Sequence, residues 1–353
     1  MSADLRDKFH GCIAASFVGS AMAAPVEGTT WQEHEATFGR VTDLLPSVHS
    51  TTGWRRPAGT TEEGVERQKR FLATIFRHGR RVTGDEIVAQ WLEDFDPRVA
   101  EHVNEPFEIR ALGMAAAGVP ARDLGGYSDL TAHVAFASAA QPIGLINAGD
   151  PDSALVDVLE IGRMYQAANS KGILWAVVTG VGVAEATRPG ADVTSVIDRV
   201  LQLGDPQWVG KELHRHLDAT RDIDNAAELR DYFDIIYGGI GIKYPTSHAN
   251  EVVTKALCLF RLTEGEVAAT ITEAVNFGRD ASSLAAIAAG LSGALAGAGG
   301  IEENWIATVD AATAANEFTV SREPVGQLAD RLYETFHAGI VAKKDFVERM
   351  VNA

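Results

Sequence analysis

The chain has 353 residues, of which 46% are hydrophobic and 22% are charged, and these values are typical of a globular protein with a large core. Its formal net charge of −17 opposes binding to nucleic acid and to anionic membranes. The N-terminus lacks the basic-then-apolar order of a signal peptide, and no uncharged apolar run is long enough to span a bilayer, so we expect a cytoplasmic protein. The two cysteines, Cys12 and Cys258, lie in apolar stretches without metal or redox spacing and are predicted to be buried thiols.

Small residues are abundant, with 34 glycines against only 7% aromatics, and this balance favours closely packed helices over sheets. The first helix is predicted over Asp4–Ala24, where apolar residues recur at helical spacing and Pro25 ends the helix. From Val26 to Gly59 the chain is predicted to be irregular, and a connection of this length is usually functional. The pair His214 and His216 lies on a charged segment and is predicted to be solvated.

The next helix is predicted to begin at Thr60 or Thr61 and to end near His78, and another begins at Thr83, which forms a capping-box pattern with Glu86. Further helices are predicted over Pro106–Ala117, Pro151–Ala167, Ile173–Thr187, Val193–Leu203, Ala226–Tyr237, Asn250–Leu262, Glu264–Asn276, Ser282–Ala298, Ile301–Asn316 and Val325–His337, with a last short helix over Lys343–Asn352. No low-complexity linker or fixed-period repeat divides this series. We therefore expect an all-α fold with a single domain over residues 1–353.

Two segments far apart in the sequence place hydroxyls and carboxylates where a loop enters a helix. They are Ala58-Gly-Thr-Thr-Glu-Glu-Gly64 and Asn276-Phe-Gly-Arg-Asp-Ala-Ser-Ser283. Each segment alone is explained by helix capping, in the first by Thr60 with Glu63 and in the second by Asp280 or Ser282. Together they offer a set of hard oxygen ligands of the kind that Mg²⁺ prefers, namely Thr61, Glu62, Glu63 and Asp280. The helix after Ser283 is so rich in alanine and glycine that it belongs in the middle of a bundle.

These motifs resemble those of the ADP-ribosylglycohydrolase family, in the same order and over most of the chain. Gly19-Ser-Ala-Met-Ala-Ala-Pro-Val-Glu27 is similar to Gly-Asp-Ala-x-Gly-x-Pro-x-Glu, Thr61-Glu-Glu-Gly64 to Thr-Asp-Asp-Thr, and Gly278-Arg-Asp-Ala-Ser-Ser283 to Gly-Gly-Asp-x-Asp-Thr. Gln141-Pro-Ile-Gly144 and Ile301-x-x-x-Trp305 also have counterparts. The resemblance implies an orthogonal helical bundle with a cleft for an ADP-ribosyl group. It also implies two Mg²⁺ or Mn²⁺ ions and hydrolysis of a glycosidic bond at the ribose anomeric carbon.

Several positions depart from the family pattern. Glu62 and Glu63 replace aspartates, Ser282 replaces an aspartate that touches the metals, and Arg279 replaces a glycine and adds a positive charge. In addition, Ser20 stands where the family has an aspartate, and Gly64 and Ser283 stand where it has threonines. A two-metal cluster needs several anionic ligands to offset four positive charges. We therefore expect at most one weakly held Mg²⁺ ion, on Thr61, Glu62, Glu63 and Asp280, or none.

Three functions are compatible with this pattern. The first is hydrolysis of an N-ribosyl bond in an ADP-ribosyl or nucleotide-derived substrate, which is either protein-linked or a small molecule. The second is silent binding of ADP-ribose or a nucleotide, and the third is another small-molecule reaction in a biosynthetic pathway. The first is favoured, because a silent site has no clear reason to keep several costly like charges together.

For the hydrolase, the predicted catalytic residues are Glu63, Glu62 and Asp280. The resemblance places a further set at the substrate: Glu27, Ser20, Gly278, Arg279, Ser282 and Ser283. The sequence indicates neither the group attached to the ribose nor the oligomeric state.

Overall fold

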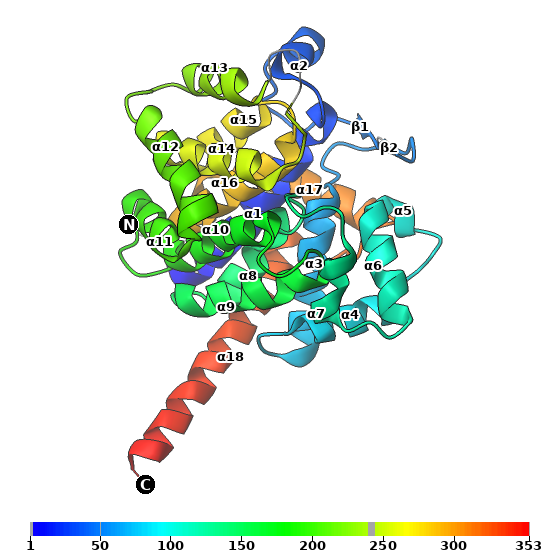
Figure 1. Ribbon diagram of the computed structural model, residues 1–353, viewed down its shortest axis with the longest axis vertical. Coiled ribbons are helices and arrows are strands. Elements are labelled where there is room, and N and C mark those ends of the chain that lie inside the picture. Colours follow the sequence, from blue (N-terminus) through cyan, green and yellow to red (C-terminus); the bar gives the residue numbers. More distant parts are fainter. Residues whose placement is uncertain (1–2, 50, 239–243, 353) are drawn as a thin grey trace.

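The computed structural model describes residues 3–49, 51–238 and 244–352, and most of them are helical (Figure 1). This confirms the predicted all-α class. The helices are α1 (Leu5–Ala23), α2 (Trp31–Phe38), α3 (Glu63–His78), α4 (Gly84–Glu93), α5 (Ala100–Val103), α6 (Pro106–Ala116), α7 (Ala121–Leu124), α8 (Gln141–Ile146), α9 (Pro151–Ile161), α10 (Lys171–Ala186), α11 (Val193–Leu203), α12 (Lys211–Ala219), α13 (Ala226–Tyr237), α14 (Ala249–Leu262), α15 (Val267–Val275), α16 (Ala281–Ala296), α17 (Glu303–Ala315) and α18 (Val325–Val351). A two-stranded antiparallel hairpin is formed by β1 (Ser47–Val48) and β2 (Arg55–Arg56).

The core is built around α1 and α16, which pack closely along most of their length. Their backbones meet where Gly11 faces Gly293, so that a side chain at either position would overlap the other helix's backbone. Helices α10, α14 and α15 pack against α16, which makes it the central helix that its composition predicts. One hydrophobic core includes buried residues from Phe9 in α1 to Leu332 in α18. This packing fixes the N-terminal ends of α3 and α16, where the two motif segments lie.

The helix that spans Leu5–Val26 is, by length and composition, apolar enough to cross a membrane, contrary to the expectation from sequence. Its most apolar window is 89% buried inside the fold. That burial is what the core helix of a globular protein shows, and the α1–α16 contact accounts for its apolar composition.

Three of the predicted segments are wrong. The helix predicted over Pro151–Ala167 ends at Ile161 and is followed by a short turn over Gly162–Met164. The segment from Val26 to Gly59 is not irregular throughout, because it contains α2, whose capping box pairs Thr30 with Glu33, and the β1–β2 hairpin. The C-terminal end does not form a separate short helix, because α18 continues without a break to Val351. Between His337 and Val351 there is no proline and one glycine, Gly339, and a single glycine does not end a helix.

Among the smaller predictions, the Thr83–Glu86 capping box and the burial of both cysteines are confirmed. The prediction that His216 is solvated is wrong, whereas His214 is exposed. The His216 side chain is fully buried, and its Nδ1 lies 2.8 Å from the hydroxyl of Tyr232. Burial lowers the pKa of His216 to about 4, with the nearby Arg215 charge adding to the effect.

Candidate active site

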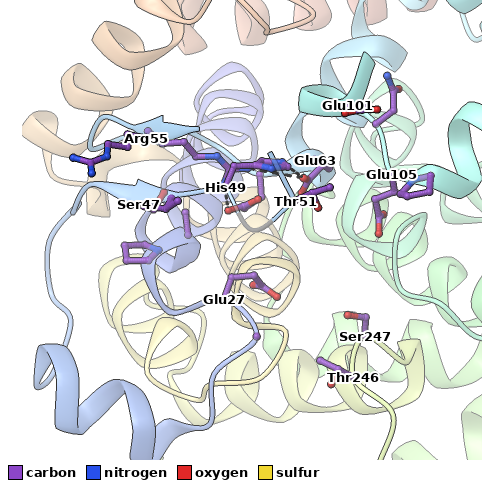
Figure 2. A pocket seen from close by; sticks show the side chains of 18 of the residues that line it. Glu27, Ser47, His49, Thr51, Arg55, Glu63, Glu101, Glu105, Thr246 and Ser247 are labelled. Atoms are coloured by element: carbon purple, nitrogen blue, oxygen red, sulfur yellow. Dashed lines mark hydrogen bonds and ion pairs between the residues drawn. The ribbon is translucent and has the colours of Figure 1, made fainter. Parts of the chain in front are cut away.

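A cavity of about 1130 Å³ opens between the β1–β2 hairpin, the start of α3 and the α5–α6 region (Figure 2). Its lining is rich in carboxylates and includes Glu27, Glu62, Glu63, Glu101 and Glu105, with Arg55, Arg56, Arg110 and His49 as the basic groups. Figure 2 shows Glu63 and His49 next to each other beside the end of the hairpin, with Glu27 below them. Glu105, Thr246 and Ser247 lie across the cavity from the hairpin (Figure 2). A space of this size accommodates a ligand as large as a nucleotide.

The start of α3 carries two adjacent carboxylates into this cavity. Glu62 is the residue that precedes the helix, and Glu63 is its first residue. The backbone N–H of Glu62 donates to the buried Ser20 hydroxyl at 3.2 Å, so Ser20 positions this turn. The predicted capping box between Thr60 and Glu63 does not form, because α3 begins at Glu63 with Glu62 at the N-cap, and the Thr60 hydroxyl donates to the carbonyl of Pro57. The Glu63 side chain is therefore free of a capping role and available to the cavity.

Arg56 supplies a positive charge directly beside these acids, and sequence analysis missed it. Strand β2 carries Arg56, whose side chain is only 4% exposed. Its guanidinium donates a hydrogen bond to Glu62 Oε1, and Nη2 lies 3.9 Å from Glu63 Oε1. The hairpin that carries it is anchored by Trp54, whose ring packs edge-on against Phe318 with 4.9 Å between centroids. The site thus contains a fixed internal cation.

His49 is a second residue that sequence analysis missed, and it orients Glu63. The backbone N–H of Thr52 donates to His49 Nδ1 at 3.1 Å, which makes Nδ1 an acceptor. A neutral ring with an accepting Nδ1 carries its proton on Nε2. Nε2 lies 2.9 Å from Glu63 Oε1 and therefore donates to that carboxylate. The hairpin turn between Thr52 and His49 thereby fixes the position of Glu63.

The two acids differ in how readily they ionise. Burial raises the pKa of Glu62 to about 8, and the negative charge of Glu63 adds to this rise. Burial also acts to raise the pKa of Glu63, but hydrogen bonds from His49 and Glu62 and the charge of Arg56 together lower it to about 2. At neutral pH the pair therefore keeps one carboxylate ionised and one proton bound, which is the division that acid–base chemistry requires.

The loop after α1 brings a third acid over the start of α16. A short turn, η1 (Ala24–Val26), leads into Glu27, and Gly28 N–H donates to the Arg279 carbonyl at 2.8 Å. In return, the Arg279 N–H donates to the Thr29 carbonyl. Glu27 Oε2 accepts the backbone N–H of Ser282 at 2.7 Å. Burial and the charges of Asp280 and Glu62 raise the pKa of Glu27 well above its ordinary value, so Glu27 lies close to acids from both motif segments.

Asp280 and Gly278 shape this end of the core helix. Asp280 caps α16 by accepting the N–H of Ser283 at 3.2 Å, which confirms the capping interpretation. Gly278 has a φ of +72°, and its α-carbon lies so close to the backbone of Trp31 that a β-carbon would overlap it. Neither residue lines the cavity; both support the elements that do.

Of the residues predicted from sequence, Glu27, Glu62 and Glu63 line the cavity, and the others do not. The predicted residues outside the lining include Ser20, which accepts the N–H of Glu62, and Ser282, whose N–H donates to Glu27, together with Thr61, Gly278, Asp280 and Ser283. The expectation that Arg279 adds its charge to the site is wrong. Its guanidinium donates to Glu251 at 2.6 Å and to the Tyr244 carbonyl at 2.9 Å, away from the cavity. Arg279 also has a φ of +62°, which glycine adopts more easily.

The donor set does not fit the two-ion centre that the resemblance implies. In the described part of the chain, no three His, Cys, Asp or Glu side chains are grouped so that they could hold an ion. Glu62 and Glu63 are engaged by Arg56 and His49, and Glu27 accepts a backbone N–H. A guanidinium beside the two acids repels a divalent cation and supplies part of the charge that such an ion would bring.

Comparisons with known proteins agree with the fold. The family model of ADP-ribosylglycohydrolase matches residues 1–340, so the chain belongs to this family of glycohydrolases. It is 26% identical over 343 residues to an uncharacterized protein of Archaeoglobus fulgidus, covering 96% of this chain and 99% of that protein. A solved structure titled "ADP-ribosylglycohydrolase-related protein complex" is similar with a TM-score of 0.61 and 19% identity, covering 94% of this chain and 99% of the other. This last likeness concerns the fold alone.

Proposed function

We propose that this protein hydrolyses an N-ribosyl bond in an ADP-ribosyl or nucleotide-derived substrate, and that Arg56 takes over part of the charge balance that metal ions provide elsewhere in the family. The observation that carries the proposal is the pair of acids, Glu62 and Glu63, at the wall of the cavity with Arg56 and His49 bound to them. A buried ionic cluster of this kind is costly to fold. A site with one ionised and one protonated carboxyl suits glycoside hydrolysis, where such pairs do the proton transfers.

The reaction breaks the bond between the ribose anomeric carbon and a nitrogen atom. As that bond lengthens, positive charge develops on the ribose, and the ionised Glu63 stabilises it. The proton held by Glu62 passes to the departing nitrogen. A water molecule then attacks the anomeric carbon, and its proton returns to the acid pair through Glu63, so the pair ends as it began.

The remaining residues position the substrate in this scheme. Glu27 has a high pKa and a carboxyl held over the start of α16, so it can bind a ribose hydroxyl without adding a further buried charge. Asp280 caps the N-terminal end of α16 and does not line the cavity. We place the departing group on the side of the cavity away from the hairpin, where Glu105, Thr246 and Ser247 lie (Figure 2).

The test is to incubate the purified protein with ADP-ribosyl compounds and ribosyl-N-heterocycles and to follow products by mass spectrometry. One arm contains a chelator and the other contains Mg²⁺ or Mn²⁺. We expect release of the N-linked group in both arms. Activity in the metal arm only would contradict the role given to Arg56. Tight ligand binding without any product would instead identify a silent binder.

A further inference from the structure

A buried ion pair that the proposed mechanism does not use lies on α3, just beyond the two acids. Glu66 and Lys69 are 3% and 1% exposed, and Lys69 Nζ lies 2.9 Å from Glu66 Oε1. Taking two charges out of water costs about as much free energy as their attraction returns, so a buried pair contributes little stability by itself. The groups that the pair binds therefore indicate its role.

The ion pair clamps the loop that joins α17 to α18. Glu66 Oε2 accepts the backbone N–H of Val320 at 2.7 Å. The hydroxyl of Thr319 accepts a hydrogen bond from Lys69 Nζ at 2.7 Å and donates to Glu66 Oε1 at 2.9 Å. Two consecutive residues of the loop are thus bound to α3, and the residue that precedes them is held with them.

That preceding residue, Phe318, joins two walls of the cavity. Its ring stacks on His102 of α5, with centroids 3.9 Å apart and 15° between the planes. The same ring packs edge-on against Trp54 of the hairpin, and the Trp54 ring lies 5.9 Å from the guanidinium carbon of Arg56. Glu101, next to His102, lines the cavity, whereas Phe318 does not. Phe318 therefore lies behind the cavity, in contact with both the hairpin and α5.

The hairpin needs such a support. Its strands are two residues long, and a two-stranded hairpin is marginally stable in water by itself. Its contacts with the acids of α3 are polar, from Arg56 to Glu62 and from His49 to Glu63. An edge-on aromatic pair adds an apolar contact with a preferred geometry, which polar contacts alone do not supply.

We propose that Phe318 is a positioning residue of the candidate active site. It keeps the hairpin where Arg56 and His49 reach the acids of α3. Glu66 lies three residues after Glu63, so one helix carries both the acids and, one turn further on, the clamp. The hairpin is thereby aligned with the helix whose acids it contacts. The positioning does not depend on the reaction, whereas its effect on catalysis rests on the proposed function.

Hydrogen–deuterium exchange of the full chain, followed by mass spectrometry, tests the proposal. In Phe318→Ala the amides of β1 and β2 should exchange about ten- to a hundredfold faster, because the aromatic contacts that hold the hairpin are lost. The amides of the central helix α16 should keep their wild-type rates, which would show that the fold has not opened as a whole. Phe336→Ala is the matched control. Phe336 is also partly buried and packs on another aromatic ring, Phe9, but it belongs to α18, far from the hairpin (Figure 1). This variant should leave the rates of β1 and β2 unchanged.

A second measurement reports on the site itself. The Nε2–H of His49 is bound by Glu63 at 2.9 Å, so it should give a protected resonance in the NMR spectrum of histidine-labelled wild type, assigned with His49→Gln. The resonance should disappear in Phe318→Ala and remain in Phe318→Tyr, which keeps the ring. It should also remain in Phe336→Ala, because a loss of stability elsewhere does not move the hairpin.

Thr319→Val tests the clamp, because it removes the hydroxyl between Lys69 and Glu66 without touching an aromatic ring. Exchange in the hairpin should again be faster than in the wild type, by less than in Phe318→Ala. Unchanged hairpin exchange in Phe318→Ala, or a His49 resonance that persists in it, would overturn the proposal. Wild-type exchange in Thr319→Val would overturn the part given to the ion pair. A loosened hairpin in a protein that hydrolyses no N-ribosyl compound would support the positioning role and contradict the proposed function, so the two are tested separately.

Discussion

Replacement of Arg56 by methionine removes the internal cation while keeping an unbranched side chain of similar length. The variant leaves Glu62 and Glu63 without the guanidinium that faces both of them. Breaking a buried ion pair by removing one partner costs about 3 to 5 kcal/mol. At the usual unfolding entropy per residue, a chain of 353 residues should then lose about 4 to 7 °C in Tm.

The loss of stability should depend on pH, and the direction of this dependence follows from the two acids that remain, Glu62 and Glu63. Without Arg56 the pKa values of both carboxyls rise, because the nearby positive charge that lowers them is gone. In the wild type the folded pKa of Glu63, about 2, lies below its unfolded value of about 4.3, so Glu63 contributes stability that is present above about pH 4.3 and is lost as the pH falls toward 2. Because the variant forfeits this contribution, its deficit should be small near pH 3 and should have grown by pH 7.

Differential scanning calorimetry at these two pH values measures the effect, with Arg56→Lys as the control that keeps a charge. The Tm of the lysine variant should fall less than that of Arg56→Met, because an ammonium retains the Coulomb attraction to the two acids. It should still fall, because lysine lacks the planar set of N–H donors of a guanidinium. A Tm loss in Arg56→Met of the same size at pH 3 and pH 7 would show that the guanidinium acts through packing alone. If Arg56 balances charge in place of an ion, Mg²⁺ or Mn²⁺ should also restore more stability to Arg56→Met than to the wild type.

Three further predictions concern single residues. Glu63→Gln keeps the size of the side chain but not its charge, so turnover should fall by roughly a hundredfold with ligand binding intact, and steady-state kinetics with near-normal turnover would exclude a catalytic role. Ser282→Asp restores a ligand of the family pattern and should strengthen Mg²⁺ binding in calorimetry; two tight ions in the wild type would show instead that Ser282 matters little. The low pKa of His216, about 4, means that the folded state resists a proton that the unfolded chain accepts below about 6.5. Stability should therefore fall as the pH drops from about 6.5 to about 4, and His216→Gln should flatten that part of the Tm profile.

Much of the helical framework could be predicted from the sequence, because helix periodicity and capping are local. Helices α11 and α13 have the predicted bounds, and the small residues of α16 already indicate a central helix. Glu27, Glu62 and Glu63 could be selected because their motifs match a known order.

The charge partners of the site were decided only by the tertiary structure. Arg56 and His49 belong to a hairpin whose strands are two residues long, too short for alternating polarity to reveal it, and they reach the acids of α3 only when the hairpin packs against that helix. Arg279 lies next to the site in sequence, but its left-handed backbone and Glu251 on α14 direct its charge away. Local patterns determine which residues form helices, whereas the neighbours of a buried charge depend on contacts between segments far apart in the chain, and those contacts set the electrostatics of this cleft.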